Sequence, residues 1–117
     1  MPDINKAIAF ARECLKWERP VLFQGQIIGY LDGLAYYSFS PESVYETQAL
    51  LERFLAKRFF IQINRGTSSL FKWSVIVGLQ DRMNGPAMFD HGRGESDDML
   101  DAVFDACVAA ARLYPKA

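Results

Sequence analysis

The stretch AMFDHGRGESDDMLDAV, residues 87–103, holds most of the residue types in this chain that could do chemistry. It contains His91, the one histidine of the sequence, with five acidic residues, an arginine and two glycines. Imidazole and carboxylate groups are common metal ligands, so a metal site on His91 with Asp90, Glu95 or Asp97 is one interpretation. The spacing matches neither the HExxH zinc motif nor a calcium-binding loop. We therefore expect no metal and no cofactor here.

The two glycines of this stretch raise a second interpretation, a phosphate site at a helix N-terminus. Gly92 and Gly94 precede a predicted helix, whose free N–H groups could bind an anion. Asp97 and Asp98 already bring negative charge to the first turn, where they would repel a phosphate. The favoured interpretation is structural: Ser96 caps the helix, the two aspartates complement its dipole, and the glycines indicate a mobile loop.

Nucleophilic catalysis finds little support in the sequence. There is no GxSxG motif, and Cys107 falls on the apolar face of a predicted helix, where thiols tend to be inert. Cys14 has a similar context, and two cysteines so far apart form neither a CxxC motif nor a disulfide framework. We expect both thiols to be reduced and buried, and the sequence favours a protein that is not an enzyme.

The charges are balanced overall but unevenly distributed. The formal net charge is −1, from 13 basic and 14 acidic residues, which argues against a dedicated nucleic-acid binder. Residues 81–105 carry seven acids against two bases, whereas residues 53–72 carry five bases and no acid. This pattern predicts a polarised surface that could steer a charged partner or support self-association. Ordinary solvated faces are the alternative explanation.

Aromatic residues in the segment GLAYYSFS form the remaining candidate site. They could stack on a base while nearby basic residues meet phosphates, which would make a nucleotide site. Packing against the core is the favoured alternative, but those that are exposed would be anchors for a protein partner. The candidate binding residues are Tyr36, Tyr37, Phe39, Arg58, Arg65 and Lys72.

The apolar periodicity indicates how these residues are positioned. It predicts helices over residues 3–17, 40–58 and 96–114, the first two capped by Asp3 and Ser40, a hairpin of strands at 59–64 and 71–80, and a third strand near 87–91. Residues 21–39 fit either a loose hairpin or an ordered loop. The predicted fold is α+β, a single domain over residues 1–117, with an antiparallel sheet of about three strands packed with three helices, like an α-β-α sandwich.

Two further features bear on packing and location. The alanines at 106, 109 and 110 would let the last helix approach a neighbouring helix or the sheet closely. The N-terminal segment has no signal-peptide pattern, and no apolar run approaches the length of a membrane span. We expect a cytoplasmic protein that has no membrane partner.

Three segments together resemble the phage ABA sandwich family, small phage proteins without an established activity. The segments are DINKAIAFARECLKW, YSFSPESVYETQALLERF and AVFDACVAAARL. The matching residues are Asp3, Ile4, Asn5, Ile8, Ala9, Trp17, Tyr37, Ser38, Ser40, Ala106, Cys107, Ala109 and Ala110. The resemblance implies a sheet sandwiched between helices and a phage or prophage origin. It implies no functional residues.

The sequence leaves two function hypotheses of different classes. The first is a small phage or prophage accessory protein that binds a host or phage protein through Tyr36, Tyr37, Phe39 and the polarised charges. The second is a protein that binds a small ligand or nucleotide, with Arg58, Arg65 and Lys72 meeting phosphates. An exposed aromatic patch would favour the first hypothesis, and a pocket lined by these arginines and tyrosines would favour the second.

Overall fold

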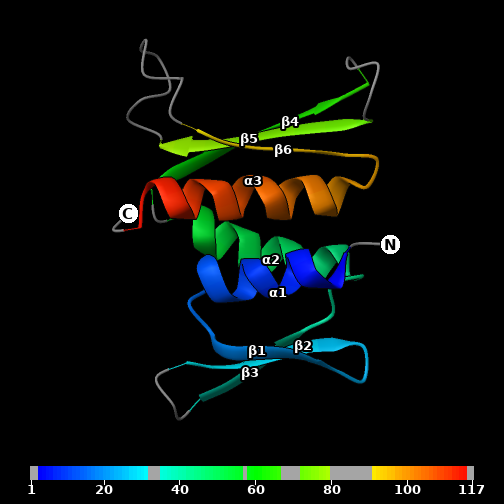
Figure 1. The fold of residues 1–117 in the computed structure, drawn as a ribbon, viewed down its shortest axis with the longest axis vertical. Helices are drawn as coiled ribbons and strands as arrows, with labels where there is room; N and C mark the ends of the chain where they lie inside the picture. The colour runs from blue at the N-terminus through cyan, green and yellow to red at the C-terminus, as the bar shows by residue number, and fades with distance from the viewer. Residues whose placement is uncertain (1–2, 32–34, 57, 67–71, 80–90, 116–117) are drawn as a thin grey trace.

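The computed structural model describes residues 3–31, 35–56, 58–66, 72–79 and 91–115 (Figure 1). Within these ranges the chain forms three helices: α1 (Ile4–Glu13), α2 (Val44–Leu55) and α3 (Met99–Leu113). Sheet A consists of β1 (Glu18–Phe23), β2 (Gln26–Leu31) and β3 (Ala35–Phe39). Sheet B consists of β4 (Phe59–Arg65), β5 (Trp73–Leu79) and β6 (Gly92–Ser96), and both sheets are antiparallel.

The helices lie between the two sheets. Sheet B occupies one end of the long axis with α3 beneath it, α1 and α2 follow, and sheet A closes the other end (Figure 1). The predicted α+β class is confirmed. The order of layers, however, is the reverse of an α-β-α sandwich, because β1, β2 and β3 form a second sheet separate from β4, β5 and β6.

Sheet A is an antiparallel meander, and the turn between β1 and β2 favours the pairing of these two strands. Gln24 and Gly25 have φ angles of 52° and 79°, as expected for a two-residue hairpin turn of the kind that matches the twist of the strands. The register of β1 shifts between Glu18 and Val21, where Arg19 also has a positive φ of 52°. This irregularity interrupts β1 near its first residue. The regular part of this edge strand is therefore short.

Sheet B packs on α3 through two glycines. A Cβ added at Gly92 would lie 2.2 Å from the Ala106 carbonyl oxygen, and one at Gly94 would lie 2.0 Å from that of Ala102. The prediction that alanines allow close approach of the last helix is confirmed. The prediction of a mobile glycine loop is wrong, because Gly92 and Gly94 belong to β6, where only a glycine fits against the helix. Most of the third strand predicted near 87–91 falls outside the described residues.

The helix termini agree with the sequence in part. Asp3 caps α1 as predicted, and its carboxylate accepts a hydrogen bond from the Asn5 backbone N–H. The cap of α2 is Ser43 rather than a residue at position 40, and the cap of α3 is Asp98 rather than Ser96. The cap lies three residues later than Ser40 in α2 and two residues later than Ser96 in α3. The Ser40 carbonyl oxygen accepts from the Ser43 N–H in a turn ahead of α2, and Ser96 is the last residue of β6.

Phe10 on α1 is the centre of the core. Its ring, which is fully buried, lies 6.4 Å from those of Phe39 and Phe54 and 5.0 Å from that of Phe104. One side chain therefore joins α1 to sheet A, α2 and α3. Trp17, which follows α1, packs 5.8 Å from Phe39 and completes the contact with sheet A.

Candidate binding surfaces

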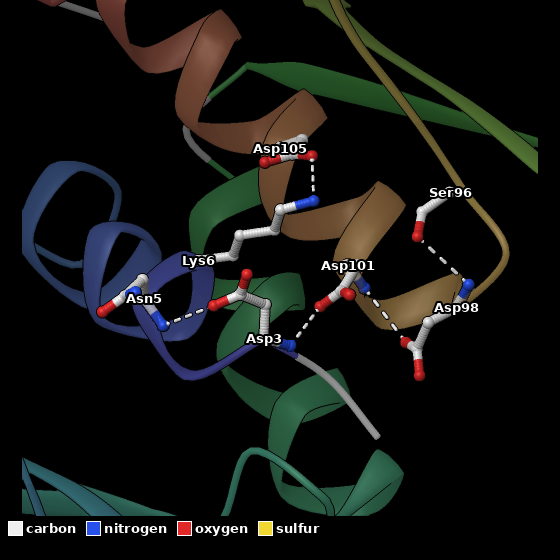
Figure 2. Close-up of polar contacts among 7 residues, drawn as sticks. All are labelled: Asp3, Asn5, Lys6, Ser96, Asp98, Asp101 and Asp105. Atoms are coloured by element: carbon white, nitrogen blue, oxygen red, sulfur yellow. Dashed lines mark hydrogen bonds and ion pairs between the residues drawn. The ribbon is translucent and has the colours of Figure 1, made fainter.

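Acidic residues just before and at the start of α3 accept hydrogen bonds that connect this helix to other elements. The Asp98 carboxylate accepts from the Asp101 N–H, and the Ser96 hydroxyl accepts from the Asp98 N–H (Figure 2). The Asp101 carboxylate in turn accepts from the backbone N–H of Asp3, which fixes the start of α1 against α3. Asp97 accepts from the backbone N–H of Lys72 at 3.1 Å. These carboxylates have structural partners, which agrees with the structural interpretation of the stretch.

An ion pair between α1 and α3 extends this network. Lys6 Nζ lies 2.8 Å from Asp105 Oδ2 (Figure 2), and its hydrogen bond to that carboxylate raises the pKa of Lys6 above its ordinary value. Partial burial raises the pKa of Asp98, but hydrogen bonding and nearby positive charge, with the hydrogen bond from the Asp101 N–H as the largest of these effects, outweigh it and hold the pKa below its ordinary value. The shifts reflect packing of helix ends and do not mark a reactive group.

A metal site does not emerge in the described part of the chain. His91 lies half-buried directly before β6. Among the described residues, no group of three or more His, Cys, Asp or Glu side chains is arranged to hold a metal ion. Asp90, one of the candidate ligands, lies outside those residues.

Both cysteines are buried, as expected, and neither is part of a disulfide. Cys107 is fully buried on α3, and desolvation, helped by the nearby Cys14 thiol, raises the pKa of Cys107 well above its ordinary value. The thiolate is the nucleophilic form, so this environment suppresses the reactivity of Cys107.

The three aromatic candidates have different environments. Phe39 is buried in the core, at 1% exposure, and so it cannot contribute to a surface. Tyr37 is 37% exposed and stacks on Trp17 with ring centroids 5.9 Å apart. Tyr36 pairs with Tyr30 in the β2–β3 ladder, but its side chain is outside the described part. Of these three, Tyr37 is the described side chain that reaches the surface.

The three basic candidates do not gather around the tyrosines. Arg58 directly precedes β4 and Arg65 ends it, which places them roughly 20 Å apart at the rise of a β-strand. Arg65 lies over the Trp73 ring at 5.4 Å. Lys72 directly precedes β5, and its carbonyl oxygen accepts a hydrogen bond from the Gly66 N–H, next to Arg65. Both residues therefore adjoin sheet B, and sheets A and B lie at opposite ends of the molecule (Figure 1). No nucleotide could contact Tyr37 and these residues together.

The predicted charge separation is also incomplete. Lys72 bonds to Asp97 through its backbone, and Trp73 pairs with both Arg65 and Ser96. The basic end of the β4–β5 hairpin therefore adjoins the acidic start of α3. Opposite charges meet there, so these two stretches do not form separate poles.

The outer face of sheet A carries an exposed apolar patch. Ile27 and Gly29 face the helices, since they pair with Phe39 and Tyr37. Residues of the opposite parity therefore face outward. On this face Val21 is 53% exposed, Phe23 58% and Tyr30 44%, and Ile28 lies among them. The apolar periodicity did not predict this patch. Reading VLFQGQI as a tight hairpin would have placed Val21 and Phe23 on one face.

Two concavities flank α2. A small one of about 160 Å³ is lined by Trp17, Tyr37 and Arg53 among others, below the size of typical ligand sites. A larger groove of about 330 Å³ lies between α2, β4 and α3. Its walls include the aliphatic side chains of Leu51, Leu55, Ile61, Ile63, Met99 and Val103.

No family model, curated protein or solved structure matches this chain. In the part that the structure describes, no helix is long and apolar enough to cross a bilayer. The function must therefore be argued from the surfaces themselves.

Proposed function

We propose that this protein acts by binding another protein through the outer face of sheet A, as a small accessory protein of phage or prophage type. The observation that supports the proposal is the exposure of Val21, Phe23 and Tyr30 on one sheet face. Contiguous apolar side chains on a surface typically mark an interaction site, since burying them releases water. Phe23 and Tyr30 provide the large, rigid rings that often anchor such contacts.

The geometry of sheet A suits a docking platform. Its inner face packs on the core through Phe39, Ile27 and Trp17, while its outer face has no described element over it (Figure 1). A partner can therefore contact the outer side chains without displacing the core. The nucleotide hypothesis lacks a comparable observation, because Arg58 and Arg65 lie at opposite ends of β4 and Lys72 lies near Arg65, so the three basic residues are not gathered around Tyr37.

Site-specific photo-crosslinking of the full chain in its native host tests the proposal. A benzophenone side chain at position 23 should give a discrete crosslinked product that Tyr30→Ser suppresses. The control is the same group at Tyr45, which is 84% exposed on α2 and is not part of sheet A. Equal labelling from both positions, or none from position 23, would refute the proposal. A product of twice the chain mass would assign the face to self-association.

A further inference from the structure

The groove between α2, β4 and α3 has the volume and lining of a ligand site. Its volume of about 330 Å³ falls within the range of small-molecule pockets. Most of the described residues that line it are aliphatic, and none is aromatic or basic. Ile63, on the floor of the groove, is 42% exposed, so apolar surface is open to water there.

An unpartnered hydroxyl lies in the wall of this groove. Thr47 lines it from α2, is only 1% exposed, and its Oγ1 has no hydrogen-bond partner in the described part of the chain. A buried hydroxyl without a partner destabilises a protein, and such groups are rare in folded structures. Because Oγ1 itself is closed off from solvent, an occupant with a hydrogen-bonding head group could provide the missing partner once the Thr47 side chain rotates toward the groove.

The charge at the groove restricts the head group further. Glu52 is the one charged residue among those described in the lining, and its carboxylate accepts a hydrogen bond from Gln48. An anionic head group would be repelled there, and the lining residues offer no arginine or lysine to receive it. A cationic head group would be attracted.

We propose that this groove binds a ligand with a single aliphatic chain and a cationic, amine-type head group. The chain would lie among Leu51, Leu55 and Ile61, and the head group would donate hydrogen bonds to Glu52 and Thr47. The proposal is independent of the protein-binding function, because the groove and the outer face of sheet A share no residue.

Methyl NMR titration of the full chain with octylamine, octanol and octanoate tests the site. Octylamine should saturably shift the methyl signals of Leu51, Ile63 and Met99, octanol should bind more weakly, and octanoate most weakly. Absence of saturable binding by octylamine, or octanoate binding as tightly as octylamine, would overturn the proposal. Methyl shifts that depend on protein concentration alone would assign the groove to a second copy of the chain, which also overturns it.

Two variants separate the roles of the polar groups. Glu52→Gln should weaken octylamine binding about two- to fivefold, the range of an exposed ion pair, and leave octanol unchanged. Glu42→Gln, the same charge change outside the groove, is the control. Thr47→Val should weaken both amine and alcohol. If octylamine binds equally to the Glu52 and Glu42 variants, the assigned head-group charge is wrong.

Discussion

Replacing Gly94 by alanine probes the contact between β6 and α3. A Cβ at this position would lie 2.0 Å from the Ala102 carbonyl oxygen and 2.9 Å from both the Ala102 carbonyl carbon and the Ala106 nitrogen. All three are backbone atoms of a helix, so no side-chain rotation can relieve the overlap. The strand and helix would have to separate by about 1 Å, which would loosen their close packing.

The expected cost follows from this geometry. Overpacking of a well-packed core usually costs about 1–3 kcal/mol, and a clash with helix backbone belongs at or above the top of that range. We expect Gly94→Ala to lower the free energy of unfolding by about 3 kcal/mol or more. A domain of this size has a total stability of roughly 6–15 kcal/mol, so the variant should fold but melt about ten degrees lower or more.

Gly66 supplies the matched control. Its φ is 78°, but an added Cβ would have no atom within 4 Å. Gly66→Ala therefore introduces only backbone strain, about 1 kcal/mol after allowing for the stiffer unfolded chain. Urea unfolding followed by circular dichroism measures both variants. If Gly94→Ala costs no more than Gly66→Ala, or if adding Ala102→Gly restores stability, the backbone clash is not the cause.

Four further predictions follow from the core and the helix cap. Phe10→Ala should cost about 3–5 kcal/mol in urea unfolding because three rings lose their contact, whereas the exposed Phe23→Ala should cost less than about 1 kcal/mol. Thr47→Val should be neutral or stabilise by about 1 kcal/mol in thermal unfolding, since its hydroxyl has no described partner; a clear loss would contradict this. Asp98→Ala should cost about 1 kcal/mol at neutral pH. Because the pKa of Asp98 is lowered by folding, its contribution is present above about pH 4 and is lost as the pH falls through the folded value, so wild type and variant should converge in acid. Cys107 should react with a thiol reagent only at the rate of unfolding.

The sequence predicted the elements whose hydrophobic pattern depends on residues close together in the chain. The spacing of α1, the cap at Asp3 and the alternation of the β4–β5 hairpin all depend on residues near one another in the chain. The α+β class follows from these elements. Local propensity was sufficient because amphipathic helices and alternating strands have one buried face each.

The missed elements depend on contacts that are distant in the chain. β6 contains two glycines, which have low strand propensity, and packs against Ala102 and Ala106 because Gly92 and Gly94 place no side chain on the face toward the helix. Trp17 continues the helical spacing of α1 but lies beyond its end, where it packs against Gly29. In both cases tertiary packing overrides the local pattern.

The candidate site residues were predicted less well than the fold because exposure is not encoded in residue type. Phe39 and Tyr37 are two positions apart on the same face of β3, yet one is buried and the other is partly exposed at the rim of the core. Val21 and Phe23 read as core residues by composition, but the register with β2 turns them outward. Only the strand pairing distinguishes these cases.

The position of Phe10 explains why the two proposed surfaces can be altered independently. Sheet A is joined to the helices through Phe39 and Trp17, whose rings pack inward, while Val21 and Phe23 lie on the opposite face of the sheet. The groove lies between α2, β4 and α3, and its lining does not include Phe54 or Phe104, the residues of these helices that contact Phe10. A change at Phe23 should therefore leave the groove intact, and a change at Glu52 should leave sheet A intact. Loss of both activities from one such substitution would indicate that the core, rather than either surface, had been damaged.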